Sequence, residues 1–304
     1  MIKLGVIGAS GPEFTQVYAP TLNSLRERVR VTVVYDYVAH CARQSAELVE
    51  ATVCRSFQEL IHNWDVDAVL MLSTGWPGML PYVECLKQDK SVYLAETSLL
   101  SDVALKQISA LAMSTTAVTS VEHRLCFSPT GLRCQELMAS ELGPPLEMTC
   151  QLNSEHSMTD QAAEIGAALG WFRWLLPGYK FNSTSISIHP QKWTLQFHKT
   201  TRTQETSEVL VHFRYQQESS QYHIKTRQGQ IWIDGENQLI WQSEAEPIGN
   251  PNSENLSNER HTTARQLDFF CRRLVGGLIP IHDLNNHLWS QQQTRLIMDQ
   301  VESE

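Results

Sequence analysis

The sequence predicts an α/β fold: an N-terminal Rossmann domain with a doubly wound parallel sheet, then a C-terminal α/β domain with a mostly antiparallel open sheet. Up to about residue 121, short apolar strands alternate with helical stretches, as in a parallel sheet with helical connections. Beyond residue 121, alternating apolar and polar runs are separated by turn residues, which is typical of antiparallel strands. We therefore expect two domains, residues 1–121 and 122–304, and the 304 residues are ample for both.

The first 36 residues have the order of a dinucleotide-binding unit. An apolar strand, 2–7, runs into a glycine turn, a helix follows over about 14–28, and a second strand, 31–35, ends at an acid. In such a unit the backbone N–H groups of the turn face a pyrophosphate, and the acid accepts hydrogen bonds from a ribose diol. An ordinary tight turn with a solvated acid is the alternative, because Ser10 and Glu13 replace two of the usual glycines. The cofactor residues expected here are Gly8, Ser10, Gly11, Pro12, Glu13 and Asp36.

The rest of the first domain repeats the alternation of strand and helix. Ser56 and Glu59 have the spacing of a capping box at a helix start. Residues 67–72 form a continuous apolar run, as expected of a parallel strand that is covered on both faces. Helices are expected at 39–50, from Ser56, at 80–88 and at 102–114, with strands at 52–54, 67–72, 91–95 and 117–121. The loops after these strands add Thr74, Gly75, Trp76 and Glu96 to the predicted cofactor edge.

The second domain is predicted to contain a sheet of hairpins and four helices. Gly229 and the pair Asp234-Gly235 mark the hairpin turns. Residues 246–258 are rich in Pro, Asn, Ser and Glu, which indicates an exposed loop. Strands are expected at 147–152, 184–189, 192–198, 208–215, 222–227 and 230–234, and helices at 129–142, 162–176, 259–275 and 283–301.

Composition restricts the class of partner. The formal net charge is −9 and no basic cluster is present, so we expect no nucleic-acid partner. Seven scattered cysteines without metal spacing indicate reduced, buried thiols and a cytoplasmic location. The eleven histidines form no ligand motif, so no metal is predicted. The chain starts with a strand and has no apolar run of membrane-spanning length, so we expect no signal peptide and no membrane partner.

With these features in place, the chain resembles the glucose–fructose oxidoreductase / inositol dehydrogenase / MocA family over nearly its whole length. The resemblance is carried by the opening that ends at Asp36, the Ser56–Leu72 block, Val92–Glu96, the Leu142-Gly143 turn and the pattern from Gly166 to Gly178. It implies a Rossmann domain that binds a nicotinamide dinucleotide. It also implies a second domain whose open sheet closes the substrate site and commonly pairs subunits.

Two departures from the family concern the chemistry. The family's catalytic lysine falls at Thr97, and its histidine on the first long helix of the second domain falls at Ala168. Without both groups, the usual alcohol–ketone chemistry has no side chain to take the hydroxyl proton. The bilin-reductase branch also lacks that lysine, and Ser120–His123 and the 162–176 helix resemble that branch.

The remaining candidates are a possible acid and two cations. His123 and Glu96 are the catalytic candidates. The alternatives are a surface histidine bonded to a neighbour for His123 and a solvated strand-end acid for Glu96. Arg124 and Arg173 are the candidates for binding an acidic substrate, while Trp171 and Trp174 share a helix face and are expected to pack.

The function predicted is an NAD(P)-dependent oxidoreductase with an atypical active site, of a biliverdin-reductase-like, imine-reductase or enoyl-reductase type. NAD is expected in preference to NADP, because an acid at residue 36 repels a 2′-phosphate. The alternative is a non-catalytic, cofactor-binding sensor or regulatory protein. A small-molecule substrate is expected, and the alternating strands of the second domain predict a homodimer through its open sheet, with a solvated monomer as the alternative.

Overall fold

The computed structural model of the chain describes residues 1–73, 78–95, 102–153, 157–176, 182–189, 192–200, 206–216, 221–245, 251–257 and 261–301. Two compact units divide the chain. The first is Met1–Glu122 with Arg260–Leu288, and the second is His123–Glu259 with Trp289–Glu304. The sequence predicts that residues 122–304 form one domain, whereas Arg260–Leu288 belong to the first unit.

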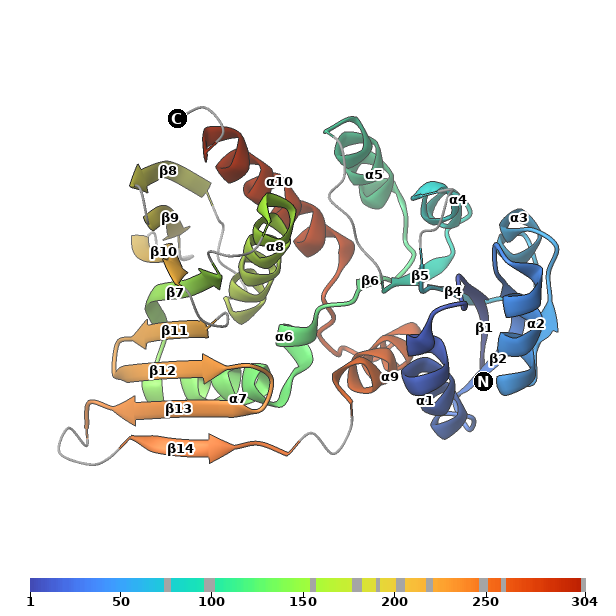
Figure 1. Cartoon of the computed structure of the whole chain (residues 1–304), viewed down its shortest axis with the longest axis horizontal. Helices are drawn as coiled ribbons and strands as arrows, with labels where there is room; N and C mark the ends of the chain where they lie inside the picture. The colour runs from blue at the N-terminus through green and yellow to red at the C-terminus, as the bar shows by residue number, and fades with distance from the viewer. Residues whose placement is uncertain are drawn as a thin grey trace. The chain divides into compact units, whose positions relative to one another are not determined.

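The first unit is built on a six-stranded parallel sheet (Figure 1). Its strand order is β3-β2-β1-β4-β5-β6, and every neighbouring pair is parallel. That order reverses beside β1, as in doubly wound sheets that bind nucleotides at the reversal point, and it confirms the predicted Rossmann fold. The strands are β1 (Ile2–Ile7), β2 (Val29–Tyr35), β3 (Thr52–Val53), β4 (Ala68–Met71), β5 (Ser91–Leu94) and β6 (Thr119–Val121).

Helices cover both faces of this sheet, so the unit has two cores. One core joins residues of β1 and β2 to η1 (Phe14–Tyr18), α1 (Ala19–Ser24), α2 (Ala39–Leu48) and α9 (Thr262–Leu274). The other joins the opposite face to α3 (Phe57–Ile61), α4 (Leu80–Lys87), α5 (Asp102–Ser114) and the first turn of α10 (Leu284–Val301). The segment 260–288 therefore belongs to the first unit because α9 buries Leu267, Phe270 and Cys271 in its core.

The first helix ends earlier than predicted and contains a π-helical turn near its start. We expected a helix over 14–28, but the helical residues end at Ser24. The N–H of Ala19 donates to the carbonyl of Phe14, five residues back, and Pro20 follows at the start of α1. A proline has no N–H and its ring crowds the preceding turn, so a wider π turn suits the residues just before Pro20.

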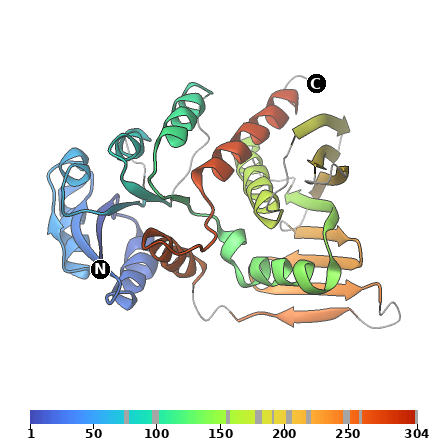
Figure 2. The same ribbon diagram turned by 180° about the vertical axis from the view of Figure 1, so that it is seen from behind.

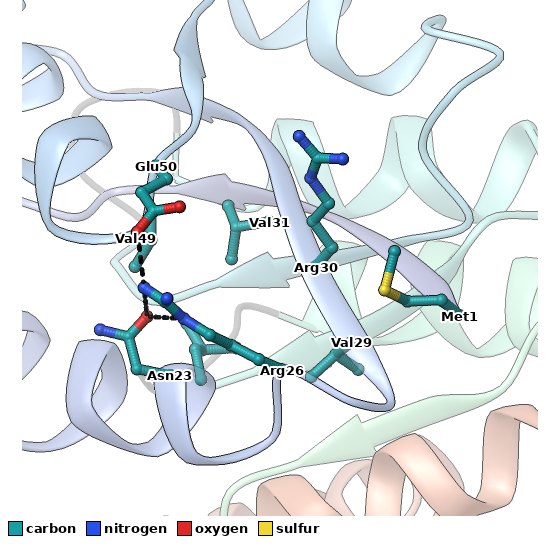
Figure 3. A pocket seen from close by; sticks show the side chains of 9 residues that line it. Met1, Asn23, Arg26, Val29, Arg30, Val31, Val49 and Glu50 are labelled. Carbon is teal, nitrogen blue, oxygen red and sulfur yellow. Dashed lines mark hydrogen bonds and ion pairs between the residues drawn. The ribbon is translucent and has the colours of Figure 1, made fainter.

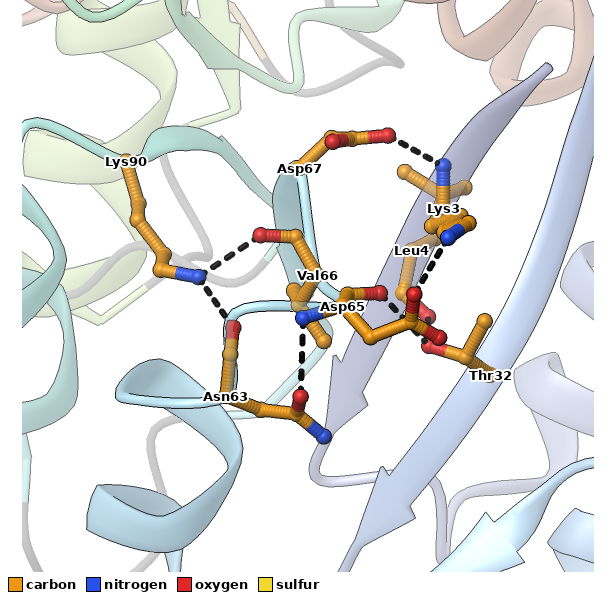
Figure 4. A network of polar contacts seen from close by, with 8 residues as sticks. All are labelled: Lys3, Leu4, Thr32, Asn63, Asp65, Val66, Asp67 and Lys90. Atoms are coloured by element: carbon orange, nitrogen blue, oxygen red, sulfur yellow. Dashed lines mark hydrogen bonds and ion pairs between the residues drawn. The ribbon is translucent and has the colours of Figure 1, made fainter.

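A polar network fastens the loop that leads into β4 (Figure 4). The backbone N–H of Lys3 donates to Asp67 at 2.8 Å, and the Lys3 ammonium pairs with Asp65. The ammonium of Lys90 donates to the carbonyls of Asn63 and Val66, each at 2.6 Å. Burial lowers the pKa of Lys90. These bonds hold the loop across the amino ends of β1 and β5, so β4 is fixed in register between them.

The second unit is built on a mixed sheet with eight strands among the described residues. The order is β14-β13-β12-β11-β7-β10-β9-β8, and only β7 and β10 are parallel neighbours. The mostly antiparallel sheet was predicted. The strands are β7 (Pro145–Asn153), β8 (Asn182–His189), β9 (Lys192–Thr200), β10 (Thr206–Gln216), β11 (Gln221–Thr226), β12 (Gly229–Asp234), β13 (Gln238–Ser243) and β14 (Asn252–Asn255).

Two of these strands were missed by the sequence prediction. No strand was expected at β13, and β14 lies inside the segment that we predicted to be an exposed loop, 246–258. Arg133 donates to the carboxylate of Glu254 on β14 through two groups. Its Nε–H is shared between the two oxygens at 2.9 and 3.3 Å, and its Nη2 donates at 3.0 Å. The indole N–H of Trp241 on β13 donates to the same carboxylate at 2.7 Å. These contacts hold a strand whose own sequence is entirely polar.

Helices cover one face of the second sheet (Figure 2). α6 (Arg124–Phe127), α7 (Pro129–Leu137) and the π-helical η2 (Met138–Leu142) precede β7, and α8 (Met158–Leu175) follows it. Trp171 and Trp174 are 0% and 7% exposed, which confirms that they pack. Among the described helices, none combines the length and the apolar character that a membrane span requires.

Candidate functional site

The carboxyl ends of β1, β2 and β4 converge on the turn at Gly8. The N–H of Gly8 donates to the carbonyl of Tyr35 at 3.0 Å, so the turn lies directly against the end of β2. Gly8 has a φ of +77°, and a Cβ there would lie 2.8 Å from the backbone N and O of Ser73. Only glycine fits both the left-handed conformation and the close approach of β4. The turn is therefore specified by steric constraint.

The predicted turn residues lie exposed beyond Gly8. Ser10, Gly11, Pro12 and Glu13 are all on the surface, and Pro12 and Glu13 are the first helical residues. In the part of the chain that the structure describes, the N–H groups of Ser10 and Gly11 donate to no protein group. A Cβ on Gly11 would meet nothing within 4 Å, so the space in front of the turn is open. Exposed, unengaged amides at a helix start are suited to binding an anion.

Asp36 ends β2 with one carboxylate oxygen engaged and the other unengaged. Its Oδ1 accepts a hydrogen bond from the N–H of Val38 at 2.9 Å, which closes the turn after the strand. Its Oδ2 is buried and has no hydrogen-bond partner among the described residues, and the whole residue is 4% exposed. Burial, and secondarily the Asp36 charge, raises the pKa of the neighbouring Tyr35. A buried acceptor without a donor is uncommon, and the missing hydrogen bond is one that water or a ligand hydroxyl can supply.

Two contacts that support this edge were not predicted. The hydroxyl of Ser45 on α2 donates to the carbonyl of Ala9 at 2.8 Å, in a buried position. The hydroxyl of Tyr37 donates to the carbonyl of Ser73 at 3.4 Å, and its ring meets Tyr35 edge-on. A helix serine and a tyrosine after a strand have no distinctive sequence signal, so only the fold reveals these contacts.

A second polar cluster, also not predicted, lies at the end of β6. The carboxylate of Glu122 accepts hydrogen bonds from the hydroxyls of Tyr18 and Tyr93, the latter at 3.2 Å. Tyr93 is fully buried, and this burial, together with the Glu122 charge, raises the pKa of its hydroxyl. The cluster therefore ties the first helix to the carboxyl ends of β5 and β6.

Several predicted residues lie outside the described part of the chain. These are Thr74, Gly75 and Trp76 after β4, and Glu96 and Thr97 after β5.

The arrangement around His123 is that of a helix cap and does not suit the predicted acid. His123 is 8% exposed, its Nδ1 accepts a hydrogen bond from the N–H of Cys126 at 3.4 Å, and its Nε2 lies 2.8 Å from the carbonyl of Ala167. Burial lowers the pKa of His123 to about 4, so the ring is neutral near pH 7. Because Nδ1 accepts, Nε2 carries the proton and donates it to Ala167. The geometry assigns His123 to the start of α6.

The two candidate cations differ in their surroundings. Arg124 is an exposed residue at the start of α6. Arg173 is half-buried on α8, and its guanidinium lies 4.8 Å from the ring centroid of Trp289. Such a cation–π contact gives Arg173 a packing role that needs no substrate. Ala168, where the resemblance would place a histidine, is fully buried.

Among the described residues, no three His, Cys, Asp or Glu side chains gather as a metal site requires.

Comparison with known proteins relates the chain to others through its fold. No family model matches the sequence, and no curated protein matches it. Solved structures do match over nearly their full length. An oxidoreductase from Sinorhizobium meliloti gives a TM-score of 0.74 at 10% identity, covering 99% of this chain and 98% of that one.

Two further neighbours have more specific descriptions. A biliverdin reductase from Synechocystis, solved with biliverdin and NADP+, gives a TM-score of 0.67 at 13% identity, with 98% of each chain covered. A putative myo-inositol dehydrogenase from Sinorhizobium meliloti gives 0.65 at 13% identity, covering 97% of this chain and 95% of that one. At these identities the likeness shows a shared fold.

Proposed function

We propose that this protein is an oxidoreductase that uses a nicotinamide dinucleotide, and that it prefers NAD to NADP. The observation that carries the proposal is the buried, unpartnered Oδ2 of Asp36 at the end of β2. A ribose hydroxyl of a dinucleotide is a donor suited to that oxygen. The shared fold supports the same assignment, since the Synechocystis neighbour was solved with NADP+.

The residues of the turn fit the rest of such a ligand. The N–H groups of Ser10 and Gly11 are exposed and suited to a pyrophosphate, and Gly11 leaves the space before them open. Gly8 lets the turn lie against β4, which places these amides beside the end of β2. When bound, the nicotinamide ring would supply the site with a hydride donor or acceptor.

The preference for NAD is argued from charge. NADP carries an additional phosphate on the adenosine ribose, which is the sugar expected beside the acid that ends β2. Two like charges a few ångströms apart repel strongly in a poorly solvated site. Asp36 is 4% exposed, so water would screen this repulsion little. We therefore infer that this chain differs from the Synechocystis neighbour, whose structure holds NADP+.

Thermal unfolding with and without cofactor tests the proposal. A ligand at 100 times its Kd stabilises a protein by about 2.7 kcal/mol, which raises the Tm by several degrees for a domain of this size. NAD or NADH should give that shift, and the phosphorylated forms a smaller one. Asp36→Ser should narrow the difference between the Tm shifts given by the NAD forms and by the NADP forms. Asp299→Ser, at an exposed acid, should leave that difference unchanged. The proposal fails if none of the four dinucleotides at millimolar concentration moves the curve.

We propose further that the substrate accepts hydride at carbon without a lysine–histidine relay. Ala168 offers no proton, and the ring of His123 is held as a cap with a pKa of about 4. Bilins, imines and conjugated enoyl compounds are substrates of that kind. Oxidation of NADH, followed by absorbance against a panel of the three classes, should show turnover with one of them. Cofactor binding without turnover on the whole panel would favour the alternative, a cofactor-holding sensor.

We also propose that two copies of the chain pair through the open face of the second sheet. On that face Glu147 stands opposite Lys225, and the rings of His223 and Trp232 stack with their centroids 5.1 Å apart. Charges of both signs beside an aromatic pair suit a self-complementary twofold contact. A hollow of about 260 Å³ beside the stack would receive side chains of the second copy; its polar lining includes Gln151, Gln221, Asp234 and Gln238.

Light scattering at micromolar protein concentration tests the pairing. A mass near twice 34.5 kDa is expected for the native chain, and Trp232→Glu should return the mass of one chain. A native mass of 34.5 kDa with no change on adding NAD would contradict the proposal.

A further inference from the structure

The open face of the second sheet carries charged residues in a reciprocal pattern. Paired residues of neighbouring strands point to the same face, so the strand register defines rows that run across the sheet. One row runs from Arg214 on β10, through one residue each of β7 and β11, to Asp234 on β12. Another row holds Glu147 on β7 and Lys225 on β11, side by side. In both rows the two opposite charges lie equally far from a line that runs along the strands between β7 and β11.

These charged side chains point away from the helices of the second unit. Met148 is fully buried on the covered face, so its neighbour Glu147 points to the open face, where its side chain is 35% exposed. Arg214, Lys225 and Asp234 are exposed. Their side chains make no hydrogen bond or ion pair with the residues that the structure describes. These three charges are therefore available to a partner.

The charges around the hollow in the first unit are, by contrast, satisfied within the chain. Figure 3 shows Arg26 directed toward Glu50, to which its Nη2 donates at 3.0 Å. Arg26 also donates to the side-chain oxygen of Asn23 at 3.1 and 3.2 Å. An arginine held in this way has little to offer a partner, and it supplies a control for the experiment below.

We propose that the twofold axis of the paired chains runs along the strands between β7 and β11, so that Arg214 of each copy meets Asp234 of the other. This inference rests on the proposed pairing through the open face. A half-turn about that line exchanges the two sides of each row and leaves its position along the strands unchanged. It therefore also places Glu147 of each copy opposite Lys225 of the other.

The dimensions of packed sheets suit these contacts. Neighbouring strands lie about 4.8 Å apart, so Arg214 and Asp234 are each about 7 Å from the axis. An arginine reaching toward an aspartate can bridge the roughly 10 Å between sheets that pack face to face. Asp234 lines the hollow of about 260 Å³ on this face, which would receive the guanidinium. The guanidinium fork matches a carboxylate in geometry.

A twofold axis across the strands would leave the same charges without partners. A half-turn about the row of Thr149 would exchange the two charged rows. Arg214 would then face Leu210, and Asp234 would face Gln230. Each charge would lose water without meeting an opposite charge, which is unfavourable. The charge pattern therefore favours the axis along the strands.

Light scattering on full-length variants tests the axis, at a concentration near the dissociation constant of the native pair. Arg214→Asp and Asp234→Arg should each weaken pairing by about tenfold or more, because like charges then meet twice. An equal mixture of these two variants should pair again, because their heterodimer has opposite charges at both contacts. The double variant should likewise pair with itself. Arg26→Asp, which reverses a charge in the first unit, should pair as the native chain does.

The possible failures are distinguishable. A native mass of 34.5 kDa would refute the pairing itself, and the axis with it. A native pair that tolerates both single substitutions would refute the axis alone. So would single variants with normal unfolding curves that remain monomeric when mixed.

Discussion

The hydroxyl of Thr263 donates to Oε1 of Glu122 at 2.6 Å, although 141 residues separate them in the chain. The other oxygen of that carboxylate accepts from Tyr18 and Tyr93. One carboxylate thus connects η1, β5, the end of β6 and α9. This explains why the segment 260–288 belongs to the first unit.

Removing the charge of this carboxylate should destabilise the first unit. Glu122→Gln replaces an acceptor of three hydroxyl hydrogen bonds with an amide that accepts through one atom only. Loss of bonds to a charged, part-buried group costs about 1–3 kcal/mol, or roughly 2–10 °C in Tm. Thr263→Val should lower the free energy of unfolding by less, and Glu47→Gln, at an exposed glutamate, should leave it unchanged. Equal melting curves for Glu122→Gln and Glu47→Gln would contradict the role.

The two turn glycines should respond differently to alanine. Gly8→Ala forces a Cβ into the backbone of Ser73 at a φ of +77°, so it should lower the free energy of unfolding by at least about 1–2 kcal/mol. Gly11→Ala meets no atom within 4 Å, so the unliganded Tm should be unchanged. If the pyrophosphate approaches this turn, Gly11→Ala should nevertheless reduce the NAD-induced shift. A full NAD shift in Gly11→Ala would place the pyrophosphate elsewhere.

Stability should fall in acid through Asp89. Hydrogen bonds from the hydroxyls of Thr115 and Thr116, and then from backbone N–H groups, lower the pKa of Asp89 to about 2 from an ordinary value of 3.8. Because the folded pKa is the lower one, this contribution is present above about pH 4 and is lost as the pH falls toward 2.

The variant Asp89→Asn isolates that contribution. Asparagine tolerates the left-handed backbone of residue 89, which has a φ of +52°, so the fold is retained. Urea unfolding between pH 6 and 2.5 should show a native-minus-variant difference that shrinks below pH 4. A difference that stays constant over that range would mean that the charge of Asp89 does not contribute. The exposed Asp299→Asn variant serves as the control.

The edge strand β14 should depend on Arg133. Hydrogen bonds from Arg133 are the largest cause of the lowered pKa of Glu254. Arg133→Lys keeps the charge but loses the two-pronged contact. Hydrogen exchange of residues 252–255 should then accelerate at least tenfold, while β11 and β12 are unaffected. Glu136→Gln, which breaks only the exposed partner of Arg133, should leave exchange in β14 as in the native chain.

The first unit could be predicted from sequence because its signals are local. Apolar runs, the Gly8 turn and the Ser56 cap each lie within a few residues of what they specify. Ser56 does accept from the N–H of Glu59 at 3.1 Å, as the capping-box spacing indicates. The carboxylate of Glu59, however, bonds the N–H of Arg55 at 2.9 Å, one residue before the cap.

What the sequence could not predict depends on contacts between distant residues. The polar strand β14 has no apolar alternation, and its contacts with Arg133 and Trp241 come from elsewhere in the chain. The residues around His123 do not reveal whether its ring is exposed or buried. Its burial depends on α8, whose Ala167 carbonyl lies against Nε2, and so only the fold reveals it. The partner of Glu122 on α9 is equally invisible in a local pattern.

The polar edge strand also affects how the protein behaves at high concentration. β14 consists of Asn, Ser, Glu and Asn, and it covers β13, whose Leu239, Ile240 and Trp241 would otherwise form the edge of the sheet. An exposed apolar edge strand recruits strands of other molecules and starts aggregation, whereas a charged, polar one does not. Detaching β14 would break only a few local contacts, but it would expose the edge of β13. We therefore expect soluble protein to be lost in a concentration-dependent way, visible as turbidity before any change in the Tm.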